Sequence, residues 1–438
     1  MNASTVGFAG MTHLGLVSAS AVAGNGFRVV CYDSDPELIS RLGKRDLPVN
    51  EPGLDELIRK NGDRQIFTTD LAAIGQCDVV YIAPDVPTDD RGQSDLSPIR
   101  KLIDTITPEL APHAVLVVLC QVPPGFTRAL TAPPPERRYY QVETLVFGQA
   151  VERAERPERF IIGCDDPGKP LDSRLRALLE TFGCPILPMR YESAELAKIS
   201  INMCLVASIS VANMLAELCE HIGAVWSEVT PALKLDRRIG AYSYLAPGLG
   251  IAGGNLERDL ATVERLASEH HSDAGIVRAW LDNSRHRRDW AVRTIRSALL
   301  DDQPDAIVAV WGLAYKENTH SVKNSPSLAT IAQLPQTRLR LHDPLVPAAA
   351  AGHARSEGFA APLEATQGAD ALMILTPWPQ YREVRPTDIA RSLRGRIVLD
   401  PYGVLDATAA AQAGLLYHTL GRPLPAPMSA QGSHATSP

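Results

Sequence analysis

The sequence predicts an α/β protein with two lobes, each built on a doubly wound parallel sheet, and a helical region between the lobes. Three observations predict this arrangement. Short β-branched runs alternate with helical stretches over the first 165 residues, a long helical pattern follows, and the alternation returns from Ala306. The chain of 438 residues is long enough for two or three domains, and 45% apolar with 21% charged residues is an ordinary globular composition.

The first lobe and the helical region follow from local patterns. Five runs are expected as strands: Thr5–Ala9, Arg28–Tyr32, Val79–Ala83, Val115–Leu119 and Phe160–Ile162. A long helix is predicted over residues 191–222, and a second helical stretch over about 257–300. Serines and asparagines interrupt the uncharged run from Ile199 to Ala216, which indicates a buried or subunit-interface helix and not a membrane span.

The second lobe is predicted from four apolar runs. They read AIVAVWG, RLRLHDP, ADALMILTPW and GRIVLDP, and each ends in turn residues where the ligand-facing loops of an open sheet lie. We therefore expect domains at residues 1–190, 191–300 and 301–420. Residues 421–438 are rich in Pro, Ser, Gly and Ala and are expected to be a disordered tail.

Charge and cysteine usage exclude several classes of protein. The net charge is −7 without a basic block, so we expect no nucleic-acid partner. Seven scattered cysteines without a C-x-x-C pair fit reduced thiols and give no zinc site, so no bound metal is expected. No basic residue precedes the first apolar stretch, which argues against a signal peptide. A cytoplasmic protein with no membrane partner is the expectation.

A dinucleotide fingerprint follows the first strand as Gly10-Met11-Thr12-His13-Leu14-Gly15. In a Rossmann domain Gly10 makes the tight turn, the helix start meets the pyrophosphate, and Gly15 lets helix and strand pack closely. Asp33 ends the next strand, where an acid bonds the ribose 2′-hydroxyl and favours NAD over NADP. Thr12 stands where a glycine normally permits close approach of the pyrophosphate, which puts tight NAD binding in question.

A succession of further motifs extends along the chain. They read EPGL, VPPGFT, ERFIIG, SAELAKISIN, DRRIG, APGLGIAGGNLERDL, GLAYKENTHSVKNSPS and TPWPQY. With the fingerprint, this order resembles the UDP-glucose/GDP-mannose dehydrogenase family from Val6 to about Leu420. The resemblance implies an N-terminal NAD-binding Rossmann domain, a central helical dimerisation region and a C-terminal nucleotide-sugar domain. It also implies a homodimer that oxidises a sugar's primary alcohol to a carboxylate by two hydride transfers.

The resemblance assigns catalytic roles to four residues. Lys198 and Asn202, one helical turn apart, match the lysine and asparagine near the reacting oxygen. Asp259 matches the aspartate that, with lysine, holds a water as proton acceptor, and Glu143 matches a glutamate that positions water or serves as a base. A charged Lys198 would stabilise a developing alkoxide. Outside this succession of motifs, the same side chains would be ordinary surface and capping residues.

The resemblance also assigns residues to the substrate and the cofactor. Gly250 and Gly253 belong to the loop that wraps the sugar, where missing side chains let backbone amides approach a ligand. Arg238 matches an arginine that reaches the substrate from the partner subunit, and Lys316 matches a lysine at the junction of sugar and cofactor. Gln121 stands at a threonine position of the cofactor-binding motif.

Several positions depart from the family pattern. Asn255 stands where the catalytic cysteine is expected, and a carboxamide cannot form the thiohemiacetal that leads to the second hydride transfer. Arg258 replaces a lysine, Phe147 replaces a glutamate, and Gln121 replaces a threonine. The loop of form V-G-T-P reads Pro84-Asp85-Val86-Pro87, while Lys323 and Tyr402 replace arginines.

The sequence therefore predicts an NAD-dependent oxidoreductase acting on a UDP- or GDP-sugar. Its chemistry is expected to stop at two-electron alcohol/aldehyde interconversion, with Asn255 orienting the sugar. Two alternatives remain open at this point. One is a non-catalytic nucleotide-sugar-binding relative, and the other is an epimerase-like enzyme that uses NAD transiently.

Overall fold

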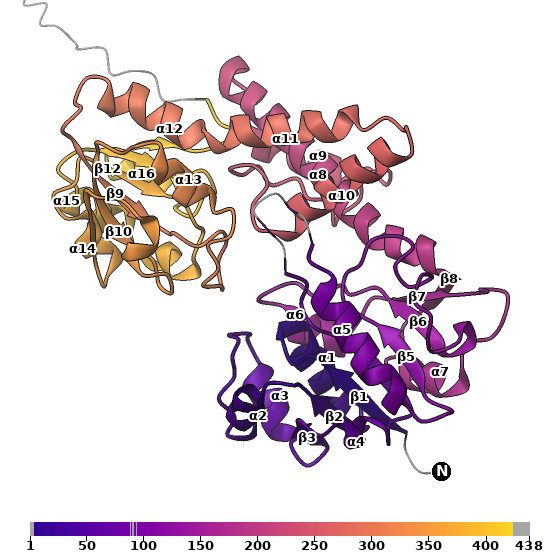
Figure 1. Ribbon diagram of the computed structural model, residues 1–438. Coiled ribbons are helices and arrows are strands. Elements are labelled where there is room, and N and C mark those ends of the chain that lie inside the picture. The colour runs from indigo at the N-terminus through magenta and orange to yellow at the C-terminus, as the bar shows by residue number, and fades with distance from the viewer. Residues whose placement is uncertain (1–3, 88, 90–91, 93, 424–438) are drawn as a thin grey trace, which may run out of the picture. The chain divides into compact units, whose positions relative to one another are not determined.

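The computed structural model describes residues 4–87, 89, 92 and 94–423, so residues 424–438 of the predicted tail lie outside the described residues. The chain forms two compact units, each with its own sheet (Figure 1). The first unit runs to Met203 and takes in Arg258–His271. The second comprises Cys204–Glu257 and the residues from Ser272 onward.

An eight-stranded sheet forms the core of the first unit, in the order β3-β2-β1-β4-β5-β6-β7-β8. Its strands are β1 (Thr5–Ala9), β2 (Arg28–Tyr32), β3 (Gln65–Thr68), β4 (Val79–Ile82), β5 (Val115–Val118), β6 (Arg138–Gln141), β7 (Phe160–Cys164) and β8 (Ile186–Arg190). Strands β1 to β6 are parallel to one another. Because β1 lies between β2 and β4, the strand order reverses there, and in open α/β sheets the ligand-binding crevice lies at such a switch point, here beyond the loops after β1 and β4.

The five strands predicted in this lobe are confirmed, and three others were missed. Strand β8 contains a proline and is mostly exposed at the sheet edge, so it lacks the apolar signal of a buried strand. One pairing also differs from the parallel arrangement, since β6 and β7 are antiparallel. The segment between them consequently stays at the carboxyl edge of the sheet, which keeps Glu143 beside the crevice.

The helices of the first unit pack on this sheet. They are α1 (His13–Gly24), α2 (Pro36–Gly43), α3 (Leu54–Lys60), α4 (Leu71–Ile74), α5 (Ser97–Ile106), α6 (Ala150–Glu155) and α7 (Ser173–Glu180), with 3₁₀ turns η1 (Thr107–Glu109) and η2 (Pro135–Arg137). Helix α1 is apolar around most of its circumference, because it is buried between the sheet and the α3 and α6 helices. That burial fixes the position of its N-terminus in the crevice.

The long helix predicted over residues 191–222 is α8 (Tyr191–Ile222). Among the described helices, α8 is the one long and apolar enough by composition to cross a bilayer. The stretch predicted over about 257–300 is divided, because His271 takes a left-handed conformation (φ 55°) in the turn after α10. The central helices are α9 (Trp226–Leu235), α10 (Asn255–Glu269), α11 (Gly275–Arg288) and α12 (Trp290–Ile295), and a π turn, η3 (Arg296–Leu300), follows α12.

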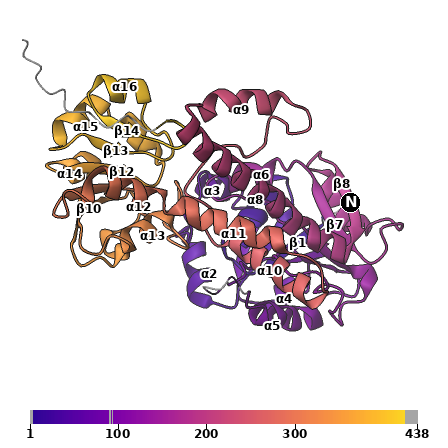
Figure 2. The same ribbon diagram turned by 90° about the horizontal axis from the view of Figure 1, so that it is seen from above.

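Within the second unit, buried ion pairs join α11 to α8. Arg287 on α11 lies 2.9 Å from Glu220 and 3.3 Å from Glu217, both on α8. Figure 2 shows α11 beside α8. The Arg287 side chain is fully buried, and a buried guanidinium with two carboxylate partners holds this helix pair in register.

The second sheet is parallel throughout, in the order β11-β10-β9-β12-β13-β14. Its strands are β9 (Ile307–Trp311), β10 (Arg338–His342), β11 (Ser356–Gly358), β12 (Ala371–Ile374), β13 (Ile397–Leu399) and β14 (Leu416–His418). Its helices are α13 (Pro326–Ala332), α14 (Pro362–Thr366), α15 (Pro386–Ser392) and α16 (Ala407–Gln412), with 3₁₀ turns η4 (Ala348–Ala351) and η5 (Pro379–Glu383). The four predicted strands are confirmed, and the three-residue edge strands β11 and β14 were missed.

Candidate active site

The turn after β1 has the geometry that the fingerprint predicts. Gly10 has φ +97°, and a Cβ on it would lie 2.8 Å from the Pro84 nitrogen. A Cβ on Gly15 would lie 1.9 Å from the Gly10 carbonyl oxygen, so only glycine lets α1 pack this closely. Asp33 at the end of β2 accepts a hydrogen bond from the Met11 amide at 2.8 Å. The turn, the close packing of α1 and the acid at the end of β2 therefore fit an NAD site.

The first residues of α1 contain the departures. Thr12 is the N-cap, and its hydroxyl accepts a hydrogen bond from the Asp85 amide at 2.7 Å. The Asp85 carboxylate in turn accepts from the His13 amide at 3.1 Å. Thus a carboxylate of the loop after β4 lies at the helix N-terminus, where the family pattern places glycines. Leu14 is buried in the core of the first unit.

The His13 ring is held in place by two contacts. Its Nε2 lies 2.9 Å from a Glu51 carboxylate oxygen, and the ring stacks on Phe147 with centroids 4.2 Å apart. Glu51 also accepts hydrogen bonds from the Gly148 and Ala150 amides, at 3.0 and 2.8 Å. The loop that carries Phe147 is thereby tied to the cofactor turn. Glu51 lies in the EPGL motif, but it is not among the site residues predicted from the sequence.

A buried polar cluster surrounds Asp259 of α10 in the first unit. The Asn202 amide donates to one Asp259 carboxylate oxygen at 2.5 Å, and the Gln121 amide donates to the other. The Arg258 guanidinium donates to the Gln121 side-chain carbonyl and lies 3.5 Å from Asp259. Burial raises the pKa of the Asp259 carboxyl, while Arg258, Asn202 and Lys198 oppose that rise. Both carboxylate oxygens are therefore engaged by the chain itself.

The catalytic lysine of the resemblance pairs with the other candidate acid. Lys198 Nζ lies 3.3 Å from Glu143 Oε2, and the two side chains are 12% and 17% exposed. Glu143 also accepts a hydrogen bond from the Leu145 amide. An ammonium and a carboxylate in contact, both reachable from solvent, can stabilise an alkoxide and accept a proton in one step.

Helix α8 is held against the loop after β5 by buried and exposed contacts. Glu195, one turn before Lys198, is fully buried and accepts from the Gly125 and Thr127 amides at 2.6 and 2.8 Å. These bonds connect the helix to the segment that carries Gln121. Glu195 is not among the residues predicted from the sequence, although its spacing of three residues from Lys198 on one helical face is a usable signal.

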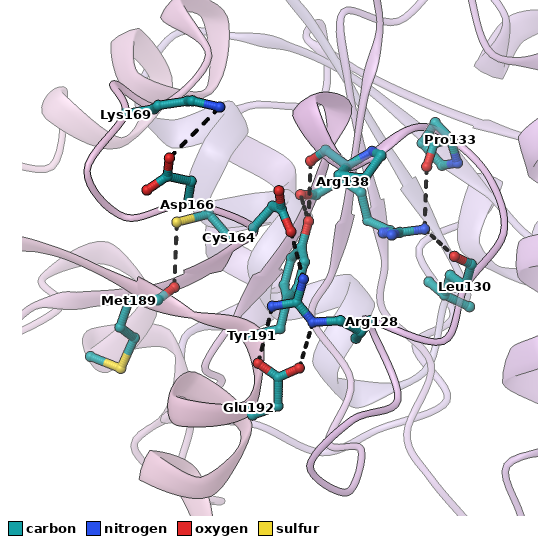
Figure 3. Close-up of polar contacts among 12 residues, drawn as sticks. Arg128, Leu130, Pro133, Arg138, Cys164, Asp166, Lys169, Met189, Tyr191 and Glu192 are labelled. Atoms are coloured by element: carbon teal, nitrogen blue, oxygen red, sulfur yellow. Dashed lines mark hydrogen bonds and ion pairs between the residues drawn. The ribbon is translucent and has the colours of Figure 1, made fainter.

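The start of α8 is anchored by a second set of contacts (Figure 3). Arg128 points toward Glu192, with its Nε 2.6 Å from the carboxylate, and lies 2.5 Å from Asp165. The Tyr191 hydroxyl donates to the Arg138 carbonyl at 2.8 Å. The first turn of α8 is therefore fixed to β6 and β7, and Lys198 two turns later takes its position from that frame.

The expected substrate glycines lie in the second unit and have conformations that favour glycine. Gly250 has φ +78°, and a Cβ would lie 2.4 Å from the Ser284 carbonyl oxygen. Gly253 has φ +83°, and a Cβ would lie 2.9 Å from the Tyr315 ring. Packing within the unit is thus sufficient to require glycine at both positions.

The other residues expected at the substrate also belong to the second unit. Asn255 is exposed at the first position of α10. Arg238 is 89% exposed and forms a close pair with Asp236 at 2.6 Å. Lys316 is half-buried, with its Nζ 5.7 Å from the centroid of the Tyr315 ring. The roles of these three residues toward a substrate stay predictions.

The thiol next to the cluster is inert. Cys120, adjacent to Gln121 in the chain, is fully buried, and burial raises the pKa of its thiol to about 12. A thiol of this kind is protonated at neutral pH and is a poor nucleophile. Over the described part of the chain, no group of His, Cys, Asp and Glu residues is arranged to hold a metal ion.

Three sequence profiles of one family match the chain. The UDP-glucose/GDP-mannose dehydrogenase family NAD binding domain matches residues 4–182, its central domain residues 192–285, and its UDP binding domain residues 309–407. The UDP-glucose 6-dehydrogenase TuaD of Bacillus subtilis is 29% identical over 94% of this chain and 92% of its own. The UDP-glucose 6-dehydrogenase of Rhizobium meliloti is 30% identical over 94% of this chain and 98% of its own.

Solved structures agree over nearly the whole chain. A UDP-glucose dehydrogenase from Pyrobaculum islandicum has a TM-score of 0.81 at 26% identity, covering 95% of this chain and 97% of that one. A UDP-D-ManNAc dehydrogenase from Pyrococcus horikoshii also has a TM-score of 0.81, at 22% identity, covering 95% and 99%. The second likeness concerns the fold alone.

Proposed function

We propose, because this chain belongs to the UDP-glucose/GDP-mannose dehydrogenase family, that it oxidises the primary alcohol of a UDP-sugar to the aldehyde and stops there. That it is an NAD-dependent oxidoreductase of nucleotide sugars follows from the family and its relatives. The choice of a UDP-sugar rests on the family's UDP binding domain at residues 309–407.

One observation carries the limit to two electrons. Asn255 begins α10, and the resemblance assigns the family's nucleophilic cysteine to this position, whereas the Asn255 carboxamide offers only hydrogen bonds. Cys120 directly precedes Gln121, which belongs to the Asp259 cluster. Burial raises the pKa of the Cys120 thiol to about 12. Residue 255 therefore supplies no thiolate that could attack the aldehyde. Slow oxidation of the aldehyde hydrate is the remaining route to an acid.

The cofactor site fits NAD in three of its four parts. Gly10 and Gly15 supply the turn, and Asp33 supplies the ribose-binding acid. The α1 N-terminus would hold the pyrophosphate, although Asp85 now contacts its first amide. When bound, NAD supplies the hydride acceptor.

The chain's own residues provide the acid–base chemistry. Lys198 directs its ammonium group at the developing alkoxide and lowers its energy as the hydride departs. Glu143, 3.3 Å from Lys198 Nζ, takes the hydroxyl proton. Asp259 holds the Asn202 and Gln121 amides in place and serves as a positioning residue.

Assembly and location complete the proposal. Four side chains on one face of α8 are exposed: Val211 (46%), Met214 (52%), Leu218 (49%) and Ile222 (64%). Spacings of three, four and four residues place them on one stripe, which a second α8 helix would cover in a homodimer.

We place the dimer in the cytoplasm, since all seven cysteines are free. We retain the domain boundaries at 190 and 300 as proposals.

The proposal is tested by counting reducing equivalents. The full-length protein is incubated with NAD and a panel of UDP- and GDP-sugars, and NADH and sugar products are quantified by absorbance and NMR. We expect one NADH per sugar consumed and an aldehyde or its hydrate as the product. Two NADH per sugar with a uronic acid would overturn the two-electron limit. An epimer without NADH would indicate transient use of NAD, and binding without turnover would indicate a non-catalytic relative.

A further inference from the structure

The loop after β4 places a carboxylate at the start of α1. Asp85 follows β4 at the point where the strand order of the first sheet reverses. Its carboxylate accepts a hydrogen bond from the His13 amide at 3.1 Å. His13 is the first residue of α1, so this amide has no partner inside the helix.

The amide that Asp85 occupies is one that a dinucleotide needs. In a Rossmann domain the pyrophosphate lies at the switch point of the sheet and accepts hydrogen bonds from the first amides of the first helix. A carboxylate has the same charge sign and the same acceptor chemistry as a phosphate oxygen. Asp85 therefore makes, within the chain, a contact of the kind that the pyrophosphate of NAD makes on binding.

Two residues hold Asp85 in this position. Its main-chain amide donates to the Thr12 hydroxyl at 2.7 Å, a bond that glycine at position 12 could not provide. The His13 ring is fixed by Glu51 at 2.9 Å and by Phe147, which keeps the helix start from turning away. Thr12 and Asp85, which both depart from the family's glycine pattern, thus contact each other directly.

Binding of NAD with Asp85 in place would bring two negative groups to one helix end. Pyrophosphate and carboxylate would compete for the His13 amide, and their repulsion would be only partly screened in a crevice. Because the Asp85 residue is exposed, its carboxylate has solvent to move into when it leaves the helix.

We propose that Asp85 is an internal competitor of the cofactor's diphosphate, held by Thr12, and that NAD binds only when the Asp85 carboxylate leaves the α1 N-terminus. This inference rests on the NAD site of the proposed function. The affinity for NAD that it predicts is independent of which product the reaction gives.

Calorimetry on the full-length protein tests the proposal with NAD and with ADP-ribose, which carries the same diphosphate without the nicotinamide. Asp85→Ala is expected to lower the Kd of both ligands by about tenfold or more, because a like charge at the phosphate position is removed. Asp85→Asn keeps the size and a hydrogen-bond acceptor but removes the charge, and should give a smaller gain. Thr12→Gly, which frees the Asp85 amide, should also tighten binding.

A matched control removes one carboxylate elsewhere in the same unit. Asp63 is exposed just before β3, at the sheet edge opposite the crevice, and Asp63→Ala should leave both Kd values unchanged. Equal or weaker binding by Asp85→Ala, or no binding by any variant, would overturn the proposal. If Asp85→Ala binds NAD tightly without turnover, the proposed function is wrong, whereas this inference is supported.

Discussion

The Arg258 guanidinium donates a hydrogen bond to the Gln121 side-chain carbonyl, and the Gln121 amide donates to Asp259. Gln121 and Arg258 are two of the positions at which the sequence departs from the family pattern, and the fold brings them into contact. Gln121 and Arg258 satisfy each other's buried polar groups, so the two departures are coupled. Their joint effect is to occupy one oxygen of the Asp259 carboxylate.

Restoring the family residues at both positions is therefore expected to raise activity. In Gln121→Thr/Arg258→Lys, the smaller threonine opens space for a water next to Asp259, which adds a second proton acceptor to the one that Glu143 supplies in the parent, and we expect kcat to rise by about tenfold. Gln121→Thr alone should destabilise the protein by about 1–3 kcal/mol, because the 7% exposed Arg258 loses its acceptor. Initial NADH formation and urea unfolding of both variants measure these effects. A double mutant slower than the parent would contradict the argument.

The roles of the two carboxylates can be separated by the size of their effects on kcat. Glu143→Gln should lower kcat by about 10²-fold, since Glu143 is the carboxylate in contact with Lys198 and takes the hydroxyl proton. Asp259→Asn should lower kcat less, because its new amide only disturbs the positions of the Asn202 and Gln121 amides. Initial rates of NADH formation at saturating substrate measure both effects. A larger loss in Asp259→Asn than in Glu143→Gln would identify Asp259 as the base.

The sequence predicted the central strands well because each is a short, buried β-branched run. Strand β4, with all residues buried, is an example, whereas the edge strand β8 mixes a proline with exposed side chains. The candidate site was predicted only in part. Gln121 and Arg258 are 137 positions apart, and no local pattern shows that they touch. The Thr12–Asp85 contact is equally non-local, since it depends on the strand order of the sheet.

Introducing a sulfur at position 255 tests the missing step of the reaction. Asn255→Cys is expected to form a thiohemiacetal with the aldehyde, so that a second hydride can leave and the NADH yield rises from one toward two per sugar. Mass spectrometry should detect the covalent adduct on residue 255. Asn255→Ser, which offers a poor nucleophile of similar size, is the control and should stay at one NADH. An unchanged yield in the cysteine variant would mean that the amide is not what limits the oxidation.

The exposed face of α8 makes a prediction about assembly. Cys204 is exposed and lies seven residues before Val211 on the proposed dimer face, whereas five other cysteines are buried. In the dimer, Cys204 should react slowly with iodoacetamide. Met214→Glu should give a monomer by light scattering and speed the labelling of Cys204. Leu345→Glu changes a 42% exposed leucine outside α8 and should do neither. A parent protein that is monomeric would refute the dimer.

Asp400 gives a prediction about stability and pH. Its carboxyl follows β13 and accepts from the Tyr417 hydroxyl at 2.7 Å and the Leu405 amide at 2.9 Å, and burial raises its pKa. Below the unfolded-state pKa of about 3.9, both states are protonated and the group has no effect. Between that value and the raised native pKa, the unfolded state has lost its proton while the native state keeps it, so stability falls as the pH rises through this window. Asp400→Asn has no proton to lose and should therefore gain stability relative to the parent between pH 4 and pH 7. Urea unfolding at both pH values measures the difference, and a difference that is the same at both would show that Asp400 does not titrate in this way.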